Sequence, residues 1–125
     1  MTPAAPGATG PQTEELLPWF TLKGVTGIGN LLFKRLIERF ETPAKVLSAS
    51  RDQLTAVAGI APRLAAAIQR ALPSDEARRE IDEAHGCGFA IVPLTAADYP
   101  ALLREIPDPP PFLYVAGRLE ASSRQ

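Results

Sequence analysis

Two closely spaced glycines, Gly27 and Gly29, stand directly before an amphipathic segment and are the first candidates for binding chemistry. Glycine permits a positive φ and leaves the neighbouring N–H groups uncovered by side chains. The free N–H groups at the start of a helix carry partial positive charge and attract anions. The stretch from Gly27 to Asn30 is therefore predicted to bind a phosphate oxygen, with Lys23 and Lys34 nearby to add positive charge.

Two helices are predicted to position this turn. From Leu31 to Phe40 the apolar residues recur at spacings of three and four, which is the pattern of a helix with one buried face. Residues 16–22 form another short apolar run before the turn. The predicted arrangement is helix, glycine turn, helix, with Thr26 and Ile28 in the turn between the helices.

The same arrangement occurs a second time, 32 positions later in the chain. The shift aligns residues 25–29 with residues 57–61 and matches the apolar positions of the helices that follow. We therefore predict a tandem helix-hairpin-helix domain, with two hairpins packed about a pseudo-dyad. The second copy has alanine in place of the second glycine, so the first hairpin is the better candidate for DNA contact; the candidates in the second are Gly59, Ile60, Ala61 and Arg63.

A purely structural interpretation of the first hairpin remains open. Glycines at positions 27 and 29 would also serve a tight connection between packed helices, or a surface that docks a protein. Contact with phosphate groups would be independent of base sequence and would weaken as salt rises. We expect at most weak DNA affinity from this chain, reduced by Lys34→Glu.

Composition limits the classes of protein that fit. The 125 residues carry a net charge of −1, which argues against binding nucleic acid by overall charge alone. Positive charge instead gathers over residues 22–40, whereas residues 74–85 are acidic. The single cysteine excludes an internal disulfide, and the chain has neither a membrane-spanning apolar run nor a secretory signal, so a cytoplasmic protein is expected.

Three segments are predicted along the chain. Residues 1–12 are predicted to be a disordered tail, and residues 13–86 a SAM-like helical domain of six helices. The predicted helix caps are Thr13, Thr42, Ser50, Ser74 and Gly86. Residues 87–125 contain two short apolar strands, 89–92 and 112–115, around a small helix within 95–105. This spacing suits a parallel βαβ unit, and we expect it to be the truncated start of an α/β domain whose remainder is missing.

Other residues that could carry chemistry have simpler explanations. Asp98 is expected to cap a helix and Tyr99 to pack. Trp19 and Phe20 lie among leucines and are expected in the core rather than stacked on bases.

Catalysis and metal binding are not expected. A dinucleotide-binding glycine motif is not present, because the third glycine of that motif would have to stand at position 32, which is Leu32. His85 and Cys87 lack further zinc ligands. With no nucleophile beside a base, the sequence predicts no enzyme, no cofactor and no metal.

The chain resembles the DprA/Smf family of DNA-processing proteins of bacterial natural transformation. The resemblance covers residues 16–118 and is carried by the first hairpin, by Asp98-Tyr99-Pro100-Ala101-Leu102-Leu103, by Ile106-Pro107-Asp108-Pro109-Pro110, and by Leu113-Tyr114-Val115-Ala116-Gly117. It implies a mainly α fold, in which a SAM-like tandem helix-hairpin-helix bundle is followed by a βαβ fragment of a truncated Rossmann-type domain.

In that family the Rossmann-type domain binds single-stranded DNA, forms a homodimer and loads RecA. The resemblance therefore implies that the full-length protein acts in recombination through that domain, while this chain is a monomer whose helical domain helps to bind or orient DNA. Two alternatives remain open: a protein-interaction or dimer-tuning module that binds no DNA, and the hairpin domain of an unrelated DNA-repair protein.

Overall fold

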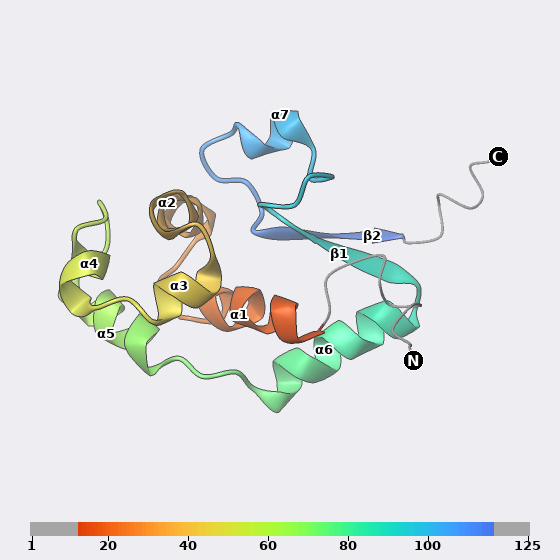
Figure 1. Ribbon diagram of the computed structural model, residues 1–125, viewed down its shortest axis with the longest axis horizontal. Helices are drawn as coiled ribbons and strands as arrows, with labels where there is room; N and C mark the ends of the chain where they lie inside the picture. The colour runs from red at the N-terminus through yellow and green to blue at the C-terminus, as the bar shows by residue number, and fades with distance from the viewer. Residues whose placement is uncertain (1–12, 117–125) are drawn as a thin grey trace.

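The computed structural model describes residues 13–116, which form six helices followed by a small two-stranded unit (Figure 1). The predicted tail, residues 1–12, and Gly117 of the last motif lie outside these residues. The elements in chain order are α1 (Thr13–Lys23), α2 (Asn30–Phe40), α3 (Pro43–Leu47), α4 (Arg51–Thr55), α5 (Pro62–Arg70), α6 (Asp75–Gly86), β1 (Phe89–Pro93), α7 (Ala101–Arg104) and β2 (Phe112–Ala116).

Local capping explains where several of these helices begin. The hydroxyls of Thr42, Ser50 and Ser74 each accept a hydrogen bond from the first turn of the following helix, and Ser50 forms a complete capping box with Gln53. Three of the predicted caps are thereby confirmed.

Three other predicted caps are wrong. Thr13 is the first described residue of α1 and already has helical conformation, and its hydroxyl donates to Asp82 of α6. Gly86 is the last residue of α6, and the residue with positive φ after this helix is Gly88, at 89°. Asp98 is exposed and caps nothing, because α7 begins after Pro100.

The core joins the helices through large apolar side chains. Trp19 of α1 stacks on Phe33 of α2 with ring centroids 5.7 Å apart, as expected for core residues. Phe20 stacks on Phe112 of β2 at 4.3 Å, which attaches the two-stranded unit to the helical bundle. Phe89 of β1 and Leu102 of α7, by contrast, are 42% and 81% exposed.

The two strands are antiparallel, which corrects the predicted parallel crossover. Pro93 at the end of β1 lies opposite Phe112 at the start of β2, and Leu94 N–H continues the ladder to Pro111 O at 2.8 Å. Arg104 folds the connection back on itself, since its guanidinium donates to Leu94 O at 3.0 Å and to Ala96 O at 2.7 Å. The chain therefore re-enters the sheet beside the point where it left, and α7 never crosses to the far end of β1.

Candidate nucleic-acid interface

The first hairpin joins α1 to α2 through a short hydrogen-bonded turn. Val25 N–H donates to Leu22 O at 3.1 Å and Ile28 N–H to Val25 O at 3.2 Å. Gly27 occupies the turn with a φ of 103°, a conformation that side chains strongly disfavour. Gly29, by contrast, has a φ of −86° and a ψ of −177°, so the predicted positive φ is correct for Gly27 and wrong for Gly29.

The second hairpin repeats these bonds 32 positions later. Val57 N–H donates to Leu54 O at 3.1 Å, Ile60 N–H donates to Val57 O at 3.1 Å, and Gly59 has a φ of 94°. Ala61, the counterpart of Gly29, has a φ of −79° and a ψ of 161°, which any residue can adopt. The internal repeat is therefore real at the level of individual backbone hydrogen bonds, and the alanine at position 61 does not alter the turn.

The two hairpins pack against each other reciprocally. A Cβ added at Gly27 would lie 3.3 Å from Leu64 of α5, and a Cβ added at Gly59 would lie 2.6 Å from Leu32 of α2. Leu32 and Leu64 are themselves 32 positions apart, so each turn receives the equivalent leucine of the other hairpin. This reciprocal packing is the arrangement that the predicted pseudo-dyad requires.

Backbone donors are open at the start of α2. No side chain caps this helix, and the N–H groups of Gly27, Gly29 and Asn30 have no acceptor among residues 13–116. The Ile28 N–H is already used by Val25 O, which removes it from the predicted set of donors. A Cβ added at Gly29 would have nothing within 4 Å, so neither backbone conformation nor packing requires glycine there. What Gly29 provides is unobstructed access to the neighbouring N–H groups.

The start of α5 offers fewer donors. Proline at position 62 lacks an N–H group, and the Cβ of Ala61 stands where the first hairpin has only hydrogen. Arg63 follows in the first turn and is exposed. The two hairpins therefore share a backbone conformation, but the second presents fewer accessible N–H groups to an anion.

The hairpin region is much more basic than the chain as a whole. Between residues 20 and 72 the sequence has eight lysines and arginines against three carboxylates, a formal charge of +5 in a chain of net charge −1. Within residues 13–116, no carboxylate lies within ion-pair distance of Lys23, Arg35 or Arg63. The net charge of the whole chain does not reflect this region, because 11 of the 14 acidic residues lie outside residues 20–72.

Lys34 does not face open solvent at the first hairpin. Its ammonium donates to Arg104 O and Ile106 O, both at 2.9 Å, and its side chain is only 17% exposed. Lys34 therefore joins α2 to the end of α7. A loss of DNA affinity in Lys34→Glu would follow from breaking this contact as well as from losing a phosphate contact, so other variants make cleaner tests.

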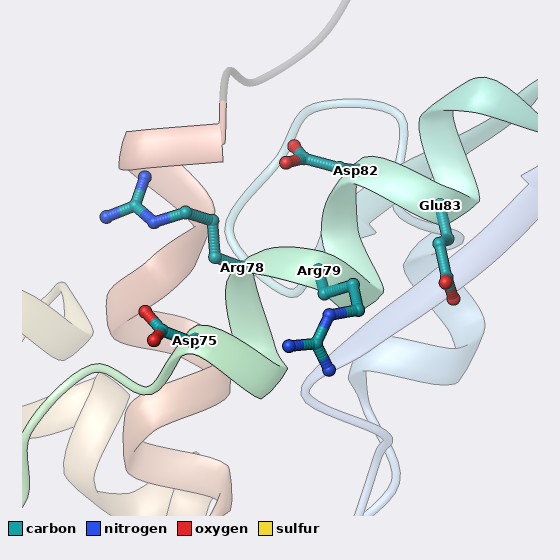
Figure 2. A pocket seen from close by; sticks show the side chains of 5 residues that line it. All are labelled: Asp75, Arg78, Arg79, Asp82 and Glu83. Carbon is teal, nitrogen blue, oxygen red and sulfur yellow. The ribbon is translucent and has the colours of Figure 1, made fainter.

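A second cluster of charged side chains lines a pocket on α6. Figure 2 shows Arg78 and Asp82 extending from one side of the helix and Arg79 and Glu83 from the other. Arg78 pairs with Glu14 of α1. Thr13 of α1 donates to Asp82, so Arg78 and Asp82 hold α6 against α1, and these two side chains are used in packing.

Other candidate residues have structural explanations. Tyr99 is buried and its hydroxyl donates to Pro110 O at 2.7 Å, as packing predicted. Residues 13–116 contain no group of three or more potential metal ligands. None of the helices in this range is long and apolar enough to cross a membrane.

Comparison with known proteins agrees with this geometry. Residues 20–72 match the family model of the SAM-like helix-hairpin-helix tandem. The chain is 31% identical over 107 residues to Protein Smf of Synechocystis, an alignment that covers 86% of this chain and 27% of that protein. It is 40% identical over 65 residues to UvrABC system protein C of Renibacterium salmoninarum, covering 52% of this chain and 10% of that protein. No solved structure matches.

These findings confirm the tandem helix-hairpin-helix fold and the resemblance to the DprA/Smf family. The chain spans about a quarter of the length of the Smf relative.

Proposed function

We propose, from the premise that residues 20–72 are a SAM-like helix-hairpin-helix tandem, that this chain binds the phosphodiester backbone of DNA without reading base sequence. The observation that carries the proposal is the open backbone at the first hairpin. Three unpartnered N–H groups, at Gly27, Gly29 and Asn30, adjoin the positive end of the α2 dipole. Phosphate oxygens are the acceptors that such a turn suits best.

The surrounding charge supports the same ligand. Lys23 ends α1 directly before the turn, is exposed and has no ion-pair partner within residues 13–116. Its ammonium adds a long-range attraction to the short-range hydrogen bonds of the backbone. Thr26 is exposed in the same turn and brings a further hydroxyl donor.

We further propose that the helical domain, residues 13–86, orients DNA for a longer protein of the DprA/Smf type. Single-strand protection, RecA loading in natural transformation and homodimer formation would then belong to the whole protein in the cytoplasm. The role of this chain would be binding rather than catalysis. The support is the similarity to Protein Smf over 86% of this chain.

The test is a binding titration of the 125-residue chain against a short DNA duplex and a single strand at two salt concentrations. Phosphate contacts predict binding at about 50 mM salt that weakens steeply towards about 200 mM. No binding to either DNA at the lower salt would refute the proposal and favour a protein-docking domain.

A glycine variant links any binding to the first hairpin. Gly29→Ala adds a methyl group where nothing lies within 4 Å, so the fold should be kept while the neighbouring N–H groups are obstructed. We expect a loss of about tenfold in affinity, since a hydrogen bond to a charged group contributes about 1.5–3 kcal/mol. Gly86→Ala, on α6, also meets nothing within 4 Å and should bind like the parent. Equal affinity of the two variants would exclude the first hairpin as the contact.

A further inference from the structure

Arg35 belongs to α2 of the first hairpin but lies against the turn of the second. Its Nη1 donates to Ala58 O at 3.0 Å, and a Cβ added at Gly59 would lie 3.2 Å from the same nitrogen. The side chain is half-buried there. Its counterpart in the repeat is Ala67, so the contact has no symmetric equivalent.

The charge of this guanidinium is not compensated within residues 13–116. No carboxylate lies within ion-pair distance of Arg35, and the bond to Ala58 O uses only one of its five N–H donors. Arginine stays protonated, and a guanidinium at the surface with no carboxylate beside it attracts anions from solution. The remaining donors are therefore available to an anion that approaches the second turn.

The second hairpin needs such a donor because its own backbone supplies few. Pro62 has no N–H group, and the Cβ of Ala61 narrows the approach that Gly29 leaves open in the first hairpin. Arg63 is exposed in the following turn and also has no ion-pair partner within the described range. Cationic side chains thus occur where backbone donors are missing.

We propose that the second hairpin binds a DNA phosphate through the guanidinium groups of Arg35 and Arg63, in place of the backbone N–H groups used by the first. This inference rests on the proposed function and adds a second contact of different chemistry. Helix α2 then serves both contacts, since its N-terminus adjoins the first phosphate and its Arg35 reaches the second. A planar guanidinium suits this role because it can hold two phosphate oxygens at once.

The test is the salt dependence of duplex affinity for the 125-residue chain and the variant Arg35→Gln. Glutamine removes the charge and stays polar, but its amide ends two atoms short of the Nη1 that donates to Ala58 O, so the structural hydrogen bond is lost with the charge. The slope of log affinity against log salt should become shallower by about 0.9, the value of one released counterion. Arg63→Gln should have the same effect, and thermal unfolding should show both variants folded.

The control is Arg79→Gln, which makes the same chemical change on an exposed position of α6. Its slope should equal that of the parent. An unchanged slope in folded Arg35→Gln, or an equal reduction in Arg79→Gln, would overturn the inference while the parent's binding still supported the proposed function. If Arg35→Gln unfolds, Arg63→Gln decides by the same criterion. Absence of binding by the parent would remove the proposed function itself, and this inference with it.

Discussion

Replacing Gly59 by alanine is expected to destabilise the fold by about 1–3.5 kcal/mol. A non-glycine residue held at a φ of 94° costs about 1–3 kcal/mol. The new Cβ would lie 2.6 Å from Leu32 Cδ2, the end of a side chain that can rotate away, so the crowding adds only about 1 kcal/mol, the low end for overpacking. Reduced freedom of the unfolded chain offsets about 0.4–1 kcal/mol.

Gly29→Ala provides the matched control. The backbone at Gly29 has a φ of −86°, the same conformation that Ala61 adopts in the repeat, and an added Cβ meets nothing within 4 Å. Alanine at position 29 should therefore leave the free energy of unfolding unchanged or raise it by up to about 1 kcal/mol.

Urea denaturation followed by circular dichroism measures both variants against the parent chain. In thermal unfolding, each kcal/mol should lower the melting temperature of a domain of this size by about 4–8 °C. Equal stability of Gly59→Ala and Gly29→Ala would refute the reasoning, because it would mean that the second turn neither holds a positive φ nor packs against Leu32.

Two further predictions concern stability. Lys34→Met should cost about 2 kcal/mol in urea denaturation, since two carbonyls at the end of α7 lose a charged donor. Lys45→Met, whose side chain is 63% exposed, should cost under about 0.5 kcal/mol, and an equal loss would contradict a role for the α7 contact. Burial, followed by the hydrogen bond to Glu80, raises the pKa of Tyr114 to about 12. This pKa lies above the value in the unfolded chain, about 10. The contribution of Tyr114 to folding stability is therefore fully present below pH ~10 and is lost as the pH rises through about 12. By about pH 11 the loss of folding stability should be roughly 1 kcal/mol or less, a value reduced for solvent screening because Tyr114 is 46% exposed. Tyr114→Phe should remove this part of the pH dependence of stability. An identical pH dependence in the variant and the parent would contradict the assignment.

The sequence alone was sufficient to predict the hairpins and most of the helix starts. A positive-φ glycine, a capping hydroxyl and a helical apolar period act within a few residues, so they can be recognised without knowing what the element packs against. The 32-residue repeat then fixed the tandem arrangement, and the reciprocal placement of Leu32 and Leu64 follows from it.

Tertiary structure decided the direction of the strands and the roles of the basic residues. Arg104 hydrogen bonds to carbonyls that precede it by eight and ten positions, and this folding-back makes the strands antiparallel. Lys34 and Arg35 are neighbours in sequence, yet one binds the end of α7 and the other binds the turn of the second hairpin. Long cationic side chains reach whatever acceptor the packing brings near, so their partners depend on the assembled helices. The local chain therefore determined where the backbone turns, and only the packed fold determined which cations remain free for a ligand.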